Sequence, residues 1–228
     1  MIKNIVVLSG AGISAESGLK TFRDSDGLWE NHKIEDVATL QAWENNPELV
    51  LEFYNQRRKQ ASLAQPNIAH KALAELEKKY NVTIVTQNVD GLHEKAGSSN
   101  VKHLHGELSK ARSTTDPTLI YDIYNSDISI GDFCEKGYQL RPDIVWFGEP
   151  VPMMEKVVTY FRSADILIAI GTSLSVYPAS SLIHYVDPFA ERYYIDPSAN
   201  ENSMSNDFII LPKKATVGVK SLVSKLLQ

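Results

Sequence analysis

The sequence predicts an α/β protein with a doubly wound parallel sheet and a smaller insert. Short, continuously apolar runs alternate with longer stretches of helical period, and strands that are apolar on both sides are typical of a parallel sheet covered by helices on both faces. A glycine pair, Gly10 and Gly12, follows directly on the first of these runs. Open α/β sheets bind their ligands at such strand ends.

The strands and helices are predicted from these runs in chain order. The four strands are expected at Ile5–Leu8, Val82–Thr86, Ile166–Ile170 and Tyr193–Ile195. The three helices are expected at Pro47–Leu63, Ala69–Tyr80 and Val217–Leu227. The first helix has the clearest start, because Asn46 is a good capping residue and proline suits the first helical position. Residues 109–140 are polar and lack long periodic stretches, so we expect a small insert there, outside the central sheet.

Length and composition narrow the class of protein. A chain of 228 residues with 43% apolar and 22% charged residues suits one domain, or a large domain with a smaller insert. The net charge of −5 predicts no broad affinity for nucleic acid or an anionic membrane. No apolar run reaches the roughly 18 residues of a membrane span. The apolar part of the N-terminus is short for a signal peptide, and we expect a cytoplasmic protein.

Polar residues follow three of the predicted strands. Gly10–Ser14 come after the first strand, Gln87–Gly91 after the second and Gly171–Ser175 after the third. Glycines let backbone N–H groups approach a pyrophosphate, and amide and carboxylate side chains can bind ribose hydroxyls. Each segment alone could be an ordinary turn, since the glycine spacing departs from the usual dinucleotide pattern. The three together favour a nucleotide site, whereas Thr21–Arg23 alone could be a solvated loop.

His105 is the strongest candidate for a catalytic base among the six histidines. It follows a β-like run, Val101–Leu104, and precedes a glycine that permits close backbone approach. An imidazole with a pKa near 6.5 suits proton removal at neutral pH. A histidine is more often a surface or structural residue, so the residues alone leave this open. His103 would point to the opposite face of an extended segment, which argues against a metal shared by the two.

Six segments in this order resemble the sirtuin family. They are Gly10–Ser14, Thr21–Arg23, Gln87–Asp90, His105–Leu108, Arg141–Glu149 and Gly171–Ser173. The resemblance runs from about Ile5 to near the C-terminus. It implies an NAD-dependent protein-lysine deacylase with a Rossmann-like large domain and a small inserted domain, whose segments we place at roughly 24–66 and 109–140.

The resemblance also implies which residues are catalytic, which bind the peptide and which bind NAD. His105 and Asn88 would be catalytic, with His105 as the base that activates a ribose hydroxyl after nicotinamide has left. The acyl-lysine peptide would add as a strand beside Val145, Phe147, Gly148 and Glu149. The products would be free lysine, nicotinamide and O-acyl-ADP-ribose. The residues expected to bind NAD are Gly10, Ala11, Gly12, Ile13, Ser14, Phe22, Arg23, Gln87, Asn88, Asp90, Gly171, Thr172, Ser173, Asp196 and Ala215.

A finer resemblance concerns the acyl group. Ala38, Tyr54 and Arg57 match residues of family members that remove succinyl, malonyl or glutaryl groups. Tyr54 and Arg57 are three apart on the predicted helix and share a face, and a phenol with a guanidinium can bind a carboxylate. The alternative is that Arg57, Arg58 and Lys59 form a solvated basic patch. We expect removal of succinyl and malonyl groups, and of acetyl groups as well.

The chain departs from many sirtuins in its cysteines. Those relatives hold a structural zinc ion with two cysteine pairs, whereas this chain has only Cys134, with Ser113 near another expected ligand position. We therefore expect no structural zinc and no other metal. Acyl-lysine proteins or peptides are the expected partners. Alternative functions are mono-ADP-ribosyl transfer, a non-catalytic NAD or peptide sensor and, less suited to this length, a dehydrogenase.

Overall fold

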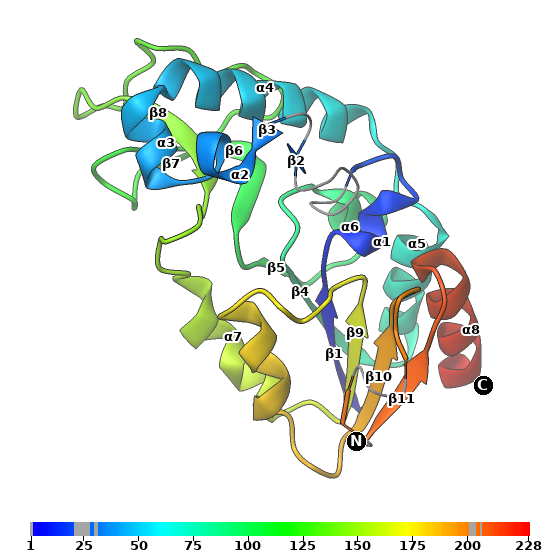
Figure 1. The fold of residues 1–228 in the computed structure, drawn as a ribbon. Helices are drawn as coiled ribbons and strands as arrows, with labels where there is room; N and C mark the ends of the chain where they lie inside the picture. The colour runs from blue at the N-terminus through cyan, green and yellow to red at the C-terminus, as the bar shows by residue number, and fades with distance from the viewer. Residues whose placement is uncertain (1, 21–27, 30–31, 201–203, 206) are drawn as a thin grey trace.

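A computed structural model describes residues 2–20, 28–29, 32–200, 204–205 and 207–228. Its centre is a six-stranded sheet in the order β11-β10-β9-β1-β4-β5, in which all neighbouring strands are parallel (Figure 1). This confirms the α/β class and the doubly wound sheet. The strands are β1 (Asn4–Ser9), β4 (Asn81–Thr86), β5 (Val101–His103), β9 (Ile166–Ile170), β10 (Glu191–Ile195) and β11 (Phe208–Leu211).

The continuous apolar strands are explained by two cores, one on each face of the sheet. In β1, Ile5 and Val7 belong to one core, and Val6 and Leu8 belong to the other. Successive side chains of a strand point to opposite faces, so a strand covered on both sides must be apolar throughout. Helices α5 (Ile68–Glu75) and α8 (Ala215–Leu227) cover the first face, while α7 (Met153–Arg162) and a 3-10 helix, η2 (Ala179–Tyr185), cover the second.

A second group of elements lies at one end of this sheet (Figure 1). The antiparallel strands β7-β6-β8 form its sheet, and the long helix α4 packs against β6 and β8. The elements within residues 34–63 and 106–144 lie together here, outside the central sheet. The small domain with segments at roughly 24–66 and 109–140 stays a prediction. The elements are α2 (Ile34–Val37), α3 (Leu40–Asn45), α4 (Pro47–Leu63), β6 (Gly106–Ser113), β7 (Ile120–Asp122) and β8 (Leu140–Ile144).

The remaining elements are short. The strands β2 (Leu28–Trp29) and β3 (His32–Lys33) pair with each other, and α1 (Gly12–Ala15) and α6 (Leu92–Lys95) are single turns after β1 and β4. A 3-10 helix, η1 (Leu76–Lys78), follows α5. No helix in the described part of the chain is long and apolar enough to cross a membrane.

The predicted elements differ from the observed ones mainly at their ends. Helix α4 has the predicted bounds, and the Asn46 side chain accepts a hydrogen bond from Leu49 N at 3.0 Å. The helix expected at Ala69–Tyr80 instead ends at Glu75, continues as η1 and leads into β4 at Asn81. Helix α8 begins two residues earlier than expected, at Ala215. The strand β11 and the helix α7 were not predicted.

The strand order reverses between β1 and β9. From β1 the chain progresses to β4 and β5 on one side, and from β9 to β10 and β11 on the other. Ligands of open α/β sheets bind beyond the carboxyl ends of the strands at such a point. The turns after β1 and β9, which contain Gly10 and Gly171, meet here, and Gly12 N donates to Gly171 O at 2.9 Å.

Candidate active site

A cavity of about 810 Å³ lies where the strand order reverses, between the central sheet and the second group of elements. Its volume is within the range of small-molecule sites, roughly 300–1,000 Å³. Most of the predicted site residues line it: Gly10, Ala11, Gly12, Ser14, Ala38, Tyr54, Arg57, Gln87, Asn88, Asp90, His105, Val145, Phe147, Gly148, Glu149, Gly171, Thr172, Ser173, Asp196 and Ala215. The cavity thus brings together segments that are far apart in the sequence.

Three predicted residues are not placed in this lining. Ile13 is fully buried and belongs to the apolar core beneath the turn, so its side chain does not face the cavity. The sequence pattern gave no means of separating it from its neighbours in Gly10–Ser14. Phe22 and Arg23 lie outside the described residues.

The glycines of the cavity allow two turns to pack against each other. A Cβ atom on Gly10 would lie 2.7 Å from Gly171 O, and one on Gly12 would lie 2.7 Å from Gly171 Cα. Gly171 itself has a φ of +57°, and a Cβ there would lie 2.4 Å from Ile13 N. These distances are too short for any side chain, so the glycines are needed to close the turns, whatever ligand binds above them.

A hydrogen-bonded chain fixes the turn after β4. Asn88 Nδ2 donates to Gly10 O at 3.2 Å and to Ser14 Oγ at 3.1 Å, and Ser14 Oγ donates to Asp90 Oδ2 at 3.0 Å. Burial raises the pKa of Asp90, against the hydrogen bonds from Leu92 N and Ser14 that lower it. The two strand ends are therefore held as one polar unit in which Asn88, only 7% exposed, is central.

His105 presents one nitrogen as a base. Its Nδ1 lies 3.0 Å from the carbonyl oxygen of Gln87, and since a carbonyl only accepts, Nδ1 must carry the proton. In the neutral ring, Nε2 is then the nitrogen that can accept a proton. Burial lowers the pKa of His105 below its usual 6.5, only partly offset by the hydrogen bond to Gln87. The imidazole is therefore neutral near pH 7 and can act as a general base.

His103 has a different role from His105. Its Nδ1 lies 2.9 Å from Asn88 O and its Nε2 lies 2.8 Å from Glu94 Oε1. Both partners are acceptors, so both nitrogens carry protons and the ring is an imidazolium. Burial opposes this charge, but Glu94 outweighs it and raises the pKa of His103. His103 is absent from the cavity lining and supports the turn of Asn88 instead.

Further polar groups line the end of the cavity near β9 and β10. Gln87 Nε2 donates to Thr172 Oγ1 at 3.0 Å, and Ser173 and Ser175 hydroxyls are 2.6 Å apart. The Asp196 carboxylate, which follows β10, accepts a hydrogen bond from Ser198 N at 2.9 Å. Ala215 is the first residue of α8 and offers only a methyl group and backbone. Hydroxyls, an amide and a carboxylate of this kind suit the hydroxyl groups of a nucleoside.

The segment Val145–Glu149 crosses the cavity beside His105. Val145 N donates to His105 O, and Phe147 N donates to Ala38 O. The Glu149 carboxylate is held by Arg141 through two hydrogen bonds of 2.9 Å and by Trp146 N at 2.8 Å. Glu149 therefore helps to close this turn, and its expected contact with a substrate stays a prediction. Its pKa is lowered, because Arg141 more than offsets the effect of burial.

Tyr54, Arg57 and Ala38 line the part of the cavity formed by α4 and α2. Tyr54 is 1% exposed, and Arg57 is 8% exposed. Burial raises the pKa of Tyr54, so its phenol is neutral at any physiological pH. The alternative of a solvated basic patch is wrong, because Arg58 is also buried and donates to Leu108 O at 2.6 Å. Only Lys59 is exposed, paired with Asp127 at 2.7 Å.

The sequence reasoning missed several residues of the lining. Trp146 is the most informative, since its indole nitrogen donates to Tyr54 Oη at 3.1 Å. Its place inside the segment Arg141–Glu149 was the available signal, because a large aromatic residue between two substrate-contacting positions must pack somewhere close. Tyr177 and Lys214 also line the cavity, and no pattern in their surroundings pointed to them.

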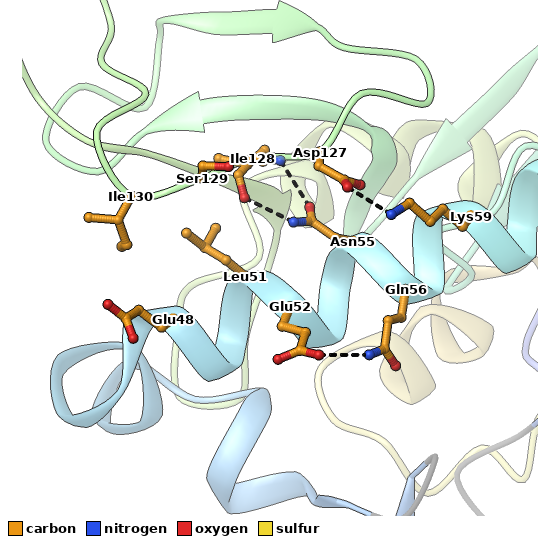
Figure 2. Close-up of a pocket in the computed structure, with 10 residues that line it drawn as sticks. All are labelled: Glu48, Leu51, Glu52, Asn55, Gln56, Lys59, Asp127, Ile128, Ser129 and Ile130. Carbon is orange, nitrogen blue, oxygen red and sulfur yellow. Dashed lines mark hydrogen bonds and ion pairs between the residues drawn. The ribbon is translucent and has the colours of Figure 1, made fainter.

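A second hollow, of about 440 Å³, lies on another side of α4 (Figure 2). Asn55 joins its two walls, because Nδ2 donates to Ile128 O at 2.9 Å and Oδ1 accepts from Ile128 N at 3.0 Å. Two of the charged side chains that line it, Lys59 and Asp127, form an ion pair with each other. None of the predicted site residues that the structure describes lines it. The hollow therefore shows how α4 is braced and is not the active site.

The region that holds zinc in many sirtuins contains one close pair here. Cys134 Sγ lies 3.4 Å from Ser113 Oγ, and both residues are buried. The described residues contain no group of three or more histidine, cysteine, aspartate or glutamate side chains placed to hold a metal ion. The absence of structural zinc stays a prediction.

Comparisons with known proteins show which family this chain is similar to. The model of the Sir2 family matches residues 10–178. A protein named NAD-dependent protein deacylase from Helicobacter pylori is 53% identical over 227 residues, which cover 100% of this chain and 99% of that protein. One of the same name from Bacteroides thetaiotaomicron is 51% identical over 231 residues, covering 99% of each. A crystal structure of a Sir2 homologue–NAD complex has a TM-score of 0.87 and 39% identity, covering 99% of this chain and 90% of that one.

Proposed function

Because the chain belongs to the Sir2 family, whose model matches residues 10–178, we propose that it is an NAD-dependent protein deacylase that acts on acyl-lysine side chains. The observation that carries this proposal is the placement of His105. His105, with Nε2 as its basic nitrogen, lines the cavity. One wall of this cavity is formed by the turns after β1, β4 and β9, and another by the segment Val145–Glu149.

The residues present fit NAD. The packed glycine turns leave no side chain over the backbone of Gly10 and Gly12, and Thr172, Ser173 and Asp196 supply groups that bind nucleoside hydroxyls. When bound, NAD would supply a ribose carbon from which nicotinamide can leave. Asn88 and Asp90 would hold the sugar near His105, which would accept a hydroxyl proton at Nε2.

The acyl-lysine would reach His105 from the segment Val145–Glu149. The N–H groups of Val145, Trp146 and Phe147 already bond within the protein. A peptide strand would therefore pair with Gly148 and with the carbonyl of Val145, in the manner of an added β-strand. The lysine side chain would then run past Phe147 into the cavity, with its acyl end towards α4.

The acyl group preferred by this enzyme carries a carboxylate. The buried Tyr54 and Arg57 line the acyl end together with the small Ala38. A neutral phenol and a guanidinium both donate to a carboxylate, and hydrogen bonds to a charged group contribute about 1.5–3 kcal/mol each. Succinyl- and malonyl-lysine are thus the proposed best substrates, with acetyl-lysine also accepted.

The test is an NAD-dependent assay on matched acetyl-, succinyl- and malonyl-lysine peptides. His105→Tyr should abolish turnover of all three. Arg57→Met should reduce kcat/KM for the succinyl peptide by at least about 10-fold more than for the acetyl peptide, the loss of one charge-assisted bond. Lys59→Met is the matched control, because it removes a positive charge from the same helix at an exposed position. Equal losses on both peptides in Arg57→Met would refute the acidic preference.

The small insert is proposed to fold without zinc. The single cysteine, Cys134, hydrogen-bonds through Sγ with Ser113 Oγ at 3.4 Å, and the pairing of β6 with β7 and β8 supplies local order that needs no metal. Elemental analysis of the purified protein should find far less than one zinc per chain, and chelator treatment should leave the melting temperature unchanged. One zinc per chain would show this proposal to be wrong.

A further inference from the structure

The hydrogen bond between Trp146 and Tyr54 fixes the role of the phenol oxygen. Trp146 Nε1 lies 3.1 Å from Tyr54 Oη, and the two side chains are 2% and 1% exposed. An indole nitrogen can only donate, so the Tyr54 oxygen accepts here. The hydrogen of the Tyr54 hydroxyl therefore cannot point towards Trp146.

The indole is itself firmly held. The Arg141 guanidinium lies 3.3 Å from the centroid of the Trp146 ring, and the Trp43 ring packs beside it with centroids 5.7 Å apart. Glu149 binds both Arg141 and the backbone nitrogen of Trp146. The contacts thus run from the end of the segment Val145–Glu149, through Arg141 and Trp146, to the tyrosine at the acyl end of the cavity.

This arrangement decides what Tyr54 can offer a ligand. One lone pair of the oxygen faces the indole N–H, so the hydroxyl hydrogen points away from Trp146. Tyr54 lines the cavity together with Arg57. A hydroxyl that presents its hydrogen attracts a carboxylate, whereas one that presents a lone pair repels it. Removing the indole N–H would allow the hydroxyl to turn between these orientations.

We propose that Trp146 is a specificity-determining positioning residue, which keeps the Tyr54 hydroxyl as a hydrogen-bond donor to the carboxylate of an acidic acyl-lysine. This inference rests on the proposed function. On this proposal, discrimination between acidic and neutral acyl groups depends on the segment Val145–Glu149 as well as on α4. Trp146 acts through Tyr54 and does not itself need to touch the carboxylate.

A double-mutant cycle tests this inference. The measured quantity is the ratio of kcat/KM for the succinyl peptide to kcat/KM for the acetyl peptide. Trp146→Phe should reduce this ratio about 10-fold, the size of one hydrogen bond to a charged group. In the Tyr54→Phe background, which has no hydroxyl to orient, Trp146→Phe should leave the ratio unchanged. An equal reduction in both backgrounds would mean that Trp146 acts by packing alone and would overturn the inference.

The wild-type arm separates this inference from the proposed function. A wild-type enzyme that turns over only the acetyl peptide would sink the acidic preference and the role of Trp146 with it. If the wild-type enzyme removes succinyl groups but the double-mutant cycle shows no coupling between Trp146 and Tyr54, only the proposed role of Trp146 is wrong.

A second measurement does not require a Trp146 variant to fold. The chain has three tryptophans, so a ¹⁵N spectrum contains three indole N–H signals. The Tyr54→Phe variant, which is nearly isosteric, should shift one of them upfield through loss of the hydrogen bond. If none of the three moves, the bond is absent in solution and the inference fails.

Discussion

At the scale of single residues, two histidines on one short stretch have opposite protonation states. His105 donates from Nδ1 to the carbonyl of Gln87, which leaves Nε2 unprotonated in the neutral ring, whereas His103 donates from both nitrogens. The difference arises from the partners, since Glu94 faces His103 and the cavity faces His105. The sequence could rank His105 first, but it could not reveal that His103 supports the turn of Asn88.

The pH dependence of catalysis should report the environment of His105. Burial lowers its pKa below 6.5, and the neutral ring is the active form. Activity should therefore persist as the pH falls below 6.5 and decline only as the pH drops through this lowered pKa. The check is the acidic limb of kcat/KM for the peptide, which reports groups of the free enzyme. An acidic limb centred at or above 6.5 would contradict this assignment.

Other residue predictions depended on contacts that a sequence does not display. Ile13 lies in a motif that otherwise lines the cavity, yet it is buried in the core because the turn points it inward. Glu149 is taken by Arg141 and Arg112, which approach it from β8 and β6. The glycines were foreseen correctly as turn residues, but their close packing against Gly171 depends on a strand 160 residues away.

At the scale of elements, α4 is the helix that carries Tyr54 and Arg57, the residues proposed to bind the acyl group. Its start is capped by Asn46, and at its end Lys95 Nζ donates to the carbonyls of Ala61, Ser62 and Ala64. The bounds were predictable because capping and proline chemistry are local. Its bracing by residues 126–128 was not, since this depends on long-range packing.

Loss of the α4 cap should destabilise the protein modestly. Asn46→Ala removes the side-chain oxygen that binds Leu49 N, and the expected loss is about 1 kcal/mol in the free energy of unfolding. Asn46→Asp retains an acceptor and serves as the control. Urea unfolding measures both variants, and equal midpoints for wild type and Asn46→Ala would contradict the capping role.

At the scale of the whole molecule, the parallel sheet was predictable and its strand order was not. Continuous apolar runs such as Ile166–Ile170 indicate burial on both faces, but the position of β9 next to β1 is set by long-range pairing. The edge strand β11 was missed because only one of its four residues, Phe208, is buried. The site depends on the strand order, because the cavity lies where that order reverses, between β1 and β9.

The stability of the fold should fall in mild acid because of a buried histidine pair. His70 and His93 are fully buried with ring centroids 4.9 Å apart, and neither nitrogen of His70 has a hydrogen-bond partner among the described residues. Burial lowers the pKa of His70 from 6.5 to about 4. Between these values the unfolded chain binds the proton and the folded protein does not, so stability is complete above pH 6.5 and is lost towards pH 4.

The loss attributable to His70 is about 3–4 kcal/mol, from a difference of about 2.5 pKa units at about 1.4 kcal/mol each. His70→Leu should flatten the dependence of the unfolding free energy on pH between 6.5 and 4. His184→Gln, at an exposed position, is the matched control and should leave the slope unchanged. An unchanged slope in His70→Leu would show that the pair is not responsible.

The pairing of β6 with β8 has a consequence for how this protein can diverge. Ser113 pairs with Leu140, and Thr114 N donates to Gln139 O, so the segment between them, which contributes β7 to the sheet, begins and ends at neighbouring positions. Within this segment, the backbone carbonyls of residues 126 and 128 accept hydrogen bonds from Arg58 and Asn55 of α4. A chimaera in which residues 114–139 are replaced by the corresponding segment of a relative would therefore change the proposed selectivity for the acyl group. Its affinity for the dinucleotide would stay the same, because the proposed dinucleotide site is built on the central sheet.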